Sequence, residues 1–421
     1  MFNAFQRTSS TVFGLLTAIV LIAIPQVAHA QVALADQLFI SEFRLRGPNG
    51  ANDEFIEIHA NPTLGSGGLV VAATSGTGYG IAASDGVTRC TIPNGTSLGR
   101  GRTFLCVNSV GYSLAAYPSR EGMTATGDAT YTTDIPDNAG IALFNNNTGG
   151  ANYSLANRVD AVGSTAETNP LYKEGAGYPA LTPFSIEYSF VRDSCGKQGS
   201  ITAFGPCPST GFLIDTNNNA TDFFFISTNG MAAGAGQRLG SPGPQNLNSP
   251  RSFPGGVHEF LLDRNVSATS PPNRVRDLTS NSANNSTFGT MEIRRRLGNS
   301  TGLPLLEIRF RIIDLTTSPA PAGIADLRAL SSASIVVSGI TDPIACTEAG
   351  SAPPCSITIR GLDLETPPSQ PNGGAFNSSL RVTGGPTGLG SINVRFVLGV
   401  QQPGSFKFWI KAEVVQQMIQ P

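Results

Sequence analysis

The pattern closest to a catalytic motif is Gly95-Thr96-Ser97-Leu98-Gly99, which has the Gly-x-Ser-x-Gly form of a nucleophile elbow. That motif activates a serine only on a strand-to-helix turn, with a histidine and an acid in the same site. Here it lies between Cys90 and Cys106, where we expect the apex of a β-hairpin. Because chains rich in Gly and Ser produce the motif by chance, we interpret Ser97 as a hairpin residue.

A cation site is the second candidate, since the run DTNNNATD from Asp215 to Asp222 places oxygen ligands at alternate positions, as calcium loops do. An EF-hand loop would need Gly at its sixth position and Glu at its twelfth, but this chain has Ala220 and Ile226 there. The alternative is an Asx-rich turn capped by its own side chains. The sequence favours the turn and leaves calcium open, so the metal ligands are unknown.

Three carboxylates near the start of the chain, Glu42, Glu54 and Glu57, suggest paired-carboxylate chemistry. Such chemistry needs groups whose surroundings drive their pKa values apart, and no perturbing pair is evident. We therefore expect them to bond to strand or turn backbone, or to pair with Arg44 or Arg46. No catalytic residue and no cofactor is predicted.

The remaining candidates are His59, His258, Trp409 and the run Arg294-Arg295-Arg296. The two histidines fall in different expected domains, so a site that used both would have to form at the interface. In a strand the arginine run divides between two faces and makes no single patch for nucleic acid. Trp409 is expected to face outward, where it would stack on a sugar or partner or be covered by a loop.

The six cysteines fall as three close pairs. Although 15 pairings are possible in principle, proximity favours the local ones, each closing a hairpin or loop. A metal site is disfavoured, because the chain has no Cys-x-x-Cys. The expected disulfides, which suit an oxidising compartment, are Cys90–Cys106, Cys195–Cys207 and Cys346–Cys355.

Residues 1–30 are typical of a secretory signal peptide, with Arg7, an apolar run over 12–24 and the small-x-small sequence Ala28-His29-Ala30. The run is shorter than the ~20 residues that span a bilayer, so a membrane anchor is the weaker alternative. Gln31 follows the expected cut, which argues against a lipoprotein. We expect a secreted, periplasmic or outer-surface protein without a membrane span after cleavage.

Charged residues make up only 13% of the chain, against about 25% in typical proteins. Loss of the signal peptide removes one Arg, so the mature charge is (27 − 1) − 29 = −3. A balance this small provides no electrostatic drive toward nucleic acid or an anionic membrane. The abundance of Gly, with 48 residues, suits many short strands linked by turns rather than long helices.

Apolar and polar residues alternate with period two in many short runs, which predicts an all-β fold. The clearest run, over 304–315, places Leu306 and Phe310 inward and Arg309 outward. A similar alternation over 405–414 places Glu413 outward. One buried and one solvated face per strand is typical of a β-sandwich.

The stretch 240–256 is rich in Pro, Gly, Ser and Asn, and has no apolar periodicity with which to dock. We interpret it as a domain boundary that few contacts cross. The predicted organisation is two independently folding β-sandwich domains, over 31–246 and 257–421, joined by a linker over 247–256.

Residues 36–246 resemble the lamin tail domain family, in its bacterial secreted type. The resemblance rests on the order of several pieces: ISEFRLRGPNGANDEFIEI, CTIPNGTSLGRGRTFLCV, DNAGIALFNNN, NRVDAVG, SIEYSFVRD, DTNNNATDFFFI and GSPGPQN. It implies a non-catalytic, immunoglobulin-like β-sandwich used for binding or anchoring. The second domain is expected to be immunoglobulin- or fibronectin-like by pattern alone.

The expected function is therefore an exported, non-catalytic protein with a binding, adhesion or cell-envelope structural role. Its partner would be another protein or an envelope polymer rather than nucleic acid. The alternative is a secreted metal-dependent hydrolase whose site is built from loops.

Overall fold

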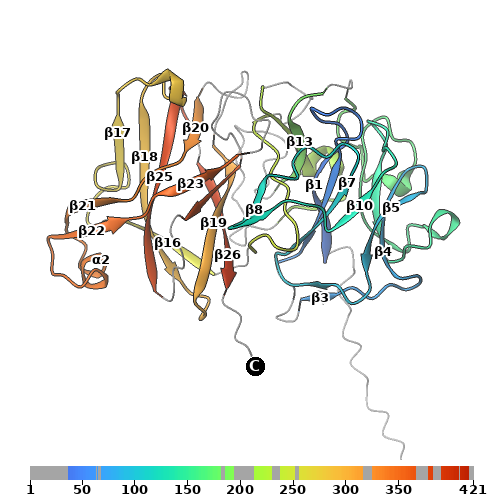
Figure 1. Cartoon of the computed structure of the whole chain (residues 1–421), viewed down its shortest axis with the longest axis horizontal. Helices are drawn as coiled ribbons and strands as arrows, with labels where there is room; N and C mark the ends of the chain where they lie inside the picture. Colours follow the sequence, from blue (N-terminus) through green and yellow to red (C-terminus); the bar gives the residue numbers. More distant parts are fainter. Residues whose placement is uncertain are drawn as a thin grey trace, which may run out of the picture. The chain divides into compact units, whose positions relative to one another are not determined.

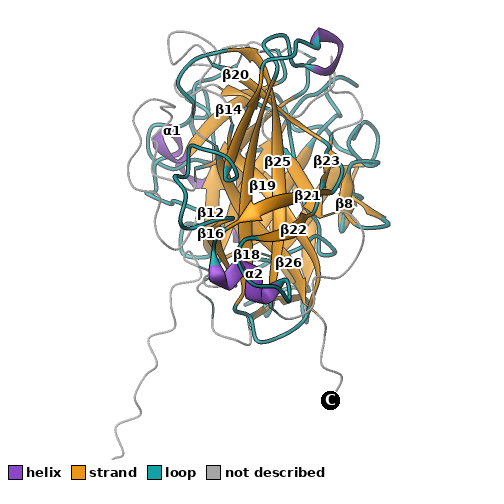
Figure 2. Ribbon diagram, turned by 90° about the vertical axis from the view of Figure 1, so that its left-hand side faces the viewer, coloured by secondary structure: helices purple, strands orange, loops and turns teal. Residues whose placement is uncertain are grey.

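A computed structural model of the chain describes residues 37–62, 64, 68–181, 185–193, 213–229, 238–251, 256–315, 325–366, 378–382, 390–406 and 408–416. The expected signal peptide and the expected Cys195–Cys207 pair lie outside these residues. Strands dominate the described part, and its two α-helices are short, α1 (Asn219–Asp222) and α2 (Pro343–Glu348) (Figure 2). The predicted all-β fold class is confirmed. None of the described helices is long and apolar enough to cross a membrane.

The N-terminal half contains a seven-stranded sheet in the order β10-β7-β2-β1-β13-β14-β15. Figure 1 labels β1, β7, β10 and β13 of this sheet. Its strands are β1 (Leu38–Arg44), β2 (Phe55–Ala60), β7 (Thr103–Asn108), β10 (Ala129–Tyr131), β13 (Tyr188–Arg192), β14 (Phe223–Ser227) and β15 (Arg238–Leu239). The pairs β10–β7 and β14–β15 are parallel, and the other neighbours are antiparallel. Antiparallel neighbours connected by turns are what the alternating runs predict.

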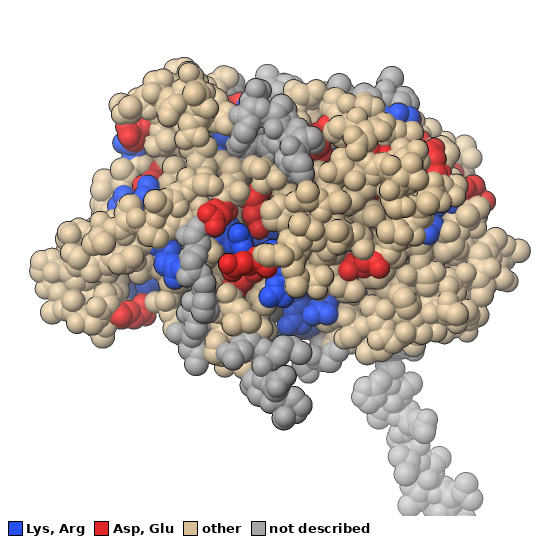
Figure 3. All heavy atoms as spheres, in the orientation of Figure 1, with Lys and Arg blue, Asp and Glu red and all other residues tan. Residues whose placement is uncertain are grey.

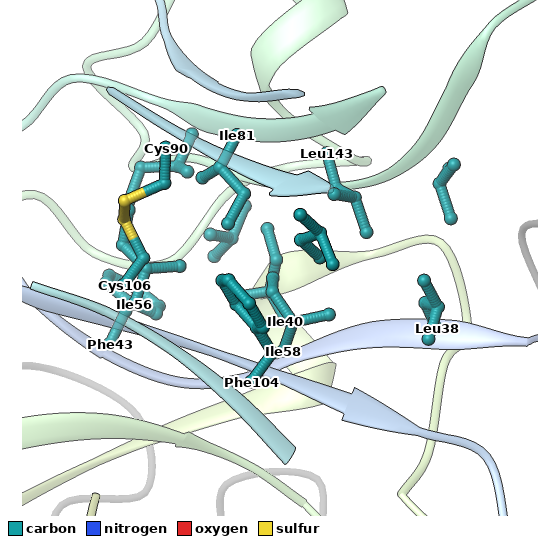
Figure 4. Packing of buried hydrophobic residues seen from close by; sticks show 14 of the residues in the cluster. Leu38, Ile40, Phe43, Ile56, Ile58, Ile81, Cys90, Phe104, Cys106 and Leu143 are labelled. Atoms are coloured by element: carbon teal, nitrogen blue, oxygen red, sulfur yellow. A yellow bond between two sulfur atoms is a disulfide. The ribbon is translucent and has the colours of Figure 1, made fainter. Parts of the chain in front are cut away.

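A four-stranded sheet of the same half has the order β12-β11-β4-β5. Its strands are β4 (Gly78–Ala83), β5 (Thr88–Pro93), β11 (Ile141–Phe144) and β12 (Arg158–Val162). Ile40, Ile58, Ile81 and Leu143, drawn from both sheets, share one buried core (Figure 4). This half is therefore a two-layer β-sandwich.

A disulfide joins Cys90 on β5 to Cys106 on β7 (Figure 4). The pairing matches the prediction, but its role differs from the expected closure of a hairpin, because the two strands belong to different sheets. The bond thus links the two layers through the core. Cys346 in α2 is joined to Cys355 in β22 (Cys355–Ile359), which also matches an expected pairing.

The C-terminal half repeats the two-layer plan. One sheet has the order β16-β18-β25-β20, with β17 beside β18, and the other has the order β23-β24-β19-β26. The strands are β16 (Val257–Leu261), β17 (Arg274–Asp277), β18 (Thr290–Asn299), β19 (Leu305–Asp314), β20 (Asp326–Leu330), β23 (Leu362–Glu365), β24 (Ser379–Val382), β25 (Ser391–Gln402) and β26 (Trp409–Gln416). Phe310 and Phe396 pack edge to face between the layers. A separate hairpin joins β21 (Ile335–Ile340) to β22.

The outward face of β19 and β26 is not solvated as the alternation predicts. Arg309 is 0% exposed, and Glu307 and Glu413 are also buried. Leu306, expected inward, is 40% exposed because the pairing of β19 with β26 shifts register between Leu305 and Glu307. A bulge of this kind turns the residues beyond it to the other side of the strand.

The buried polar face of β19 contacts the N-terminal half. Arg309 donates to the carboxylate of Glu365 at 2.6 Å and to the carbonyl of Pro118, at the start of β8 (Pro118–Arg120), at 3.2 Å. Tyr117 bonds through its hydroxyl to that of Ser378 at 2.8 Å. Polar residues that look like a solvated face therefore form a hydrogen-bonded junction between the two halves.

The stretch 240–256 is also docked where the structure describes it, so the expectation of few contacts is wrong. Ser241 and Gln245 are buried, and the backbone N–H of Gly243 donates to Glu42 at 3.0 Å. The Asn246 side chain donates to the carbonyl of Thr124, in β9 (Met123–Thr124), at 3.0 Å. These contacts are hydrogen bonds, which apolar periodicity does not reveal. Separate folding of 31–246 and 257–421 stays a prediction.

Candidate functional site

The residues that could hold a cation surround the guanidinium group of Arg192 at the end of β13. Asp160 on β12 accepts from it at 2.6 Å, and Asp215 and Asp222 lie 3.3 and 3.7 Å from it. Ligand oxygens of Asp160, Glu174 and Asp215 all lie within 4.8 Å of one another. No other such group of His, Cys, Asp or Glu occurs in the described part of the chain. We use the name Arg192 cluster for Arg192, Asp160, Glu174, Asp215 and Asp222.

Glu174 is the least satisfied member of the cluster. Its Oε1 accepts from Arg158 at 3.0 Å, whereas its Oε2 is buried without a hydrogen-bond partner among the described residues. Burial, followed by the negative charges of Asp160 and Asp215, raises the pKa of Glu174 to about 9. The side chain is therefore neutral at pH 7, and three carboxylates rather than four face Arg192.

Both oxygens of Asp160, by contrast, already have donors. Asp160 accepts the backbone N–H groups of Ile40 and Ala161 as well as Arg192. A cation at this place would compete with the guanidinium group of Arg192, which lies 2.6, 3.3 and 3.7 Å from Asp160, Asp215 and Asp222. The arrangement therefore serves as a buried ion pair that ties β12 to β13.

The 215–222 segment forms the Asx-rich turn that the sequence favours. The carboxylate of Asp222 accepts the backbone N–H groups of Thr216 and Asn218, and Asp215 accepts that of Asn217. Asn217 has a φ of 56°, the left-handed region that Asn tolerates better than most residues. The carboxylates that resemble calcium ligands in the sequence are thus acceptors for the turn's own backbone.

Glu54, one of the three carboxylates singled out in the sequence, accepts hydrogen bonds from groups that belong to the fold. It takes one bond from the Asn108 amide and one from the Ile135 N–H, each 2.8 Å long. Burial raises its pKa to about 8. Burial is the main cause, and the negative charge of Asp134 adds a smaller rise.

Glu42 and Glu57 lie at the junction of the two halves. Glu57 accepts from the Ser41 hydroxyl at 2.6 Å and from the Gln245 N–H at 2.7 Å. Glu42 accepts from Arg311 on β19 at 2.6 Å. The backbone partners match the expectation, but the arginine comes from the far half of the chain.

Arg44 and Arg46, the partners considered from the sequence, pair elsewhere. Arg44 is fully buried between Asp53 and Glu187. Arg46 pairs with Asp137 at 2.8 Å in a partly exposed place. Sequence proximity is therefore a poor guide to the ion pairs in this sandwich.

The other candidates do not meet in one place. Ser97 lies on β6 (Ser97–Leu98), after a turn from β5, rather than before a helix. His59 is buried, and the positive charges of Lys411 and Arg311 add to burial in holding its pKa well below the usual value. His258 is exposed on β16, and neither histidine belongs to a possible metal-binding group among the described residues.

The arginine run is neutralised along β18. Arg294, Arg295 and Arg296 each form an ion pair, with distances of 2.5, 2.5 and 2.6 Å to glutamates on β18, β16 and α2. Trp409 is only partly exposed at the start of β26. Neither feature presents an open charged or aromatic patch.

Sequence reasoning missed a cavity of about 330 Å³ that is lined by Arg102, Arg120 and Arg251. Leu247 from the docked stretch, with Leu306 and Val414 from the C-terminal half, completes much of its wall. Lys and Arg side chains gather near the middle of the face shown in Figure 3, with Asp and Glu side chains beside them. We call this cavity the arginine pocket. No sequence signal reveals it, because its arginines are far apart along the chain.

The chain was compared with known proteins. Neither a family model, nor a curated protein, nor a solved structure matches it. The resemblance to lamin tail domains over 36–246 therefore rests on its sequence motifs alone.

Proposed function

We propose that this chain is an exported, non-catalytic β-sandwich protein with a binding, adhesion or envelope role, and that it is related to the lamin tail domains over 36–246. The observation that carries the proposal is the use of its acidic side chains. Glu42, Glu54 and Glu57 accept hydrogen bonds from backbone, amide, hydroxyl and guanidinium donors. Groups bound in this way hold strands and loops in position.

Two further features support export to an oxidising compartment. The disulfide that joins the two sheets of the N-terminal half and the one at α2 would be reduced in a typical cytosol. The 1–30 segment has the three-part pattern of a signal peptide. Together they favour a role in the periplasm, at the outer surface or in the medium, with another protein or an envelope polymer as the partner.

Purified mature protein provides the test of the non-catalytic role. It should turn over no ester, peptide, glycoside or nucleic-acid substrate, with or without added Ca²⁺, Mg²⁺ or Zn²⁺. Metal-dependent turnover that disappears in Glu174→Gln, while the variant keeps its melting temperature, would establish the hydrolase alternative. Fractionation of the native host, followed by pull-down from its envelope, should place the protein outside the cytoplasm with a bound partner.

A further inference from the structure

We propose that the arginine pocket binds an oxyanion, a phosphate, sulfate or carboxylate group carried on a small polar body such as a sugar. The inference goes beyond the proposed function, because it names a site and a ligand chemistry. It rests on three arginines that converge on one cavity from separate parts of the fold.

The position of each arginine is set by a different element. Arg102 immediately precedes β7, Arg120 ends β8, and Arg251 ends the described part of the docked stretch. The backbone of Arg251 pairs with that of Val414 on β26, with N–O distances of 3.0 and 2.7 Å in the two directions. Ordered backbone on every side therefore holds the three side chains around the cavity.

The guanidinium groups of the pocket have no ion-pair partner among the described residues. Within the part of the chain that the structure describes, no carboxylate forms a salt bridge with Arg102, Arg120 or Arg251. The Nε atoms of Arg102 and Arg120 are buried without a hydrogen-bond acceptor in the described residues. Buried polar groups in proteins almost always have partners, so these donors indicate an absent acceptor.

The nearest acids accept from backbone donors, although one oxygen of Glu307 is buried without a partner among the described residues. Asp128, whose pKa is influenced by the charge of Arg102, accepts the N–H groups of Leu105 and Leu247 at 2.8 and 3.0 Å. Glu307, in electrostatic reach of Arg120, accepts the N–H of Glu121 at 3.1 Å. These acids reduce the positive potential without filling the cavity.

Repulsion inside the pocket adds a second argument. The pKa of Arg251 is lowered, first by burial and then by the positive charges of Arg102 and Arg100. Like charges held together cost free energy unless a counter-ion joins them. An oxyanion would receive paired N–H donors from guanidinium groups, whose planar forks match carboxylate and phosphate oxygens.

The size and the lining residues of the cavity indicate what kind of body carries the anionic group. A volume of about 330 Å³ falls at the lower end of small-molecule sites, which is more than a bare phosphate needs. Leu247, Leu306 and Val414 provide an apolar side to the cavity. A sugar phosphate, sugar sulfate or uronic acid would place its charge on the arginines and its ring against this apolar side.

The test uses the full mature protein at low ionic strength. Inorganic phosphate, glucose 6-phosphate, glucuronate and neutral glucose are titrated by calorimetry, and melting temperatures are measured in parallel. Glucose 6-phosphate and glucuronate should bind more tightly than inorganic phosphate, and glucose should not bind. If inorganic phosphate binds as tightly as the sugar anions, the site recognises only the free ion. That result would overturn the proposal that the ligand carries a sugar.

Arg251→Gln and Arg120→Gln are the pocket variants, and Arg294→Gln is the control, because it removes the same charge from the paired run on β18. Each pocket variant should weaken glucose 6-phosphate binding about tenfold or more, whereas the control should bind like the wild type. Without ligand, Arg251→Gln should melt at a higher temperature than the wild type, since it relieves the repulsion. Arg120→Gln provides the binding comparison if Arg251→Gln does not fold.

Three results would overturn the proposal. One is the absence of heat and of a melting shift with every anion up to about 10 mM. The second is equal weakening by the control, which would assign binding to overall charge. The third is lower stability of both pocket variants with unchanged anion affinity, which would make these arginines structural.

Discussion

The Arg192 cluster and the arginine pocket use the same side chain in opposite ways. In the cluster one arginine is enclosed by carboxylates and is fully buried. In the pocket three arginines border one cavity, and none has a carboxylate partner among the described residues. An arginine whose charge is matched within the fold contributes to the structure, whereas unmatched ones at a cavity point to a ligand.

Replacement of Arg192 should have the largest effect on stability. Arg192→Met leaves Asp160 and Asp222 buried without their cation, so the free energy of unfolding should fall by about 3–5 kcal/mol. Urea denaturation of the mature protein measures the loss. Arg46→Gln breaks the partly exposed pair with Asp137 and should cost less than about 1 kcal/mol. Equal losses in the two variants would remove the distinction between buried and exposed pairs.

Producing the two halves as separate fragments should affect the Arg192 cluster and the arginine pocket differently. The cluster lies wholly in the N-terminal half, while the pocket also needs Leu306 and Val414. The fragment 33–251 should melt cooperatively, because it keeps its own core and inter-sheet disulfide. In this fragment Arg192→Met should lower the free energy of unfolding as much as it does in the mature protein. The fragment should not bind the anion.

The C-terminal fragment 257–421 provides the matching measurement, and it should also be soluble and cooperative. Aggregation or a molten state of either fragment would indicate that the polar junction at Arg309 and Arg311 is essential for folding. Anion binding by 33–251 alone would show that the pocket needs no residue from the C-terminal half.

The dependence of stability on pH should include a contribution from Glu174, which comparison with Glu174→Gln isolates. Its pKa of about 9 in the fold exceeds that of the unfolded chain, so between pH of about 5 and 9 the folded state holds a proton that the unfolded state releases. Stability should therefore fall as pH rises through this window. Gln at position 174 does not titrate, so the free energy of unfolding of Glu174→Gln should not fall in this way. Relative to the wild type, it should therefore increase with pH in denaturation curves. A difference that stays constant with pH would place an ionised Glu174 in the cluster.

The smallest effect on stability is expected for Arg251→Gln in the arginine pocket, and this effect should depend on salt. Arg251→Gln should stabilise the protein by less than about 1 kcal/mol at low salt, since it removes a repulsion in a partly exposed place. The gain should shrink as NaCl is raised, because the Debye length falls from about 30 Å at 0.01 M to about 3 Å at 1 M. A gain that is independent of salt would point to packing rather than charge.

Much of the fold could be predicted from local patterns. The alternating run 304–315 contains β19 (Leu305–Asp314), and the run 405–414 overlaps β26 (Trp409–Gln416). The pairings Cys90–Cys106 and Cys346–Cys355 followed from proximity in the chain. These features depend on near neighbours, and a period of two is visible in the sequence because each strand has one apolar face.

The candidate sites could be predicted only in part. Asp215 and Asp222 were considered as oxygen ligands, but their pairing with Arg192 was not predicted, since this arginine reaches them from another element. Arg102, Arg120 and Arg251 carry no shared motif. Their convergence depends on the docked stretch and on β26, which no local rule connects.

By itself the sequence determined the all-β class, the main strands and two of the disulfides, because side-chain alternation and short chain separation act locally. Tertiary structure alone decided which polar residues are buried, as at Arg309 and Glu413, where one sandwich covers a face that the alternation assigns to solvent. It also decided which charges meet. A buried charge needs a partner wherever in the chain that partner lies, so Arg311 pairs with Glu42 across 269 residues of sequence.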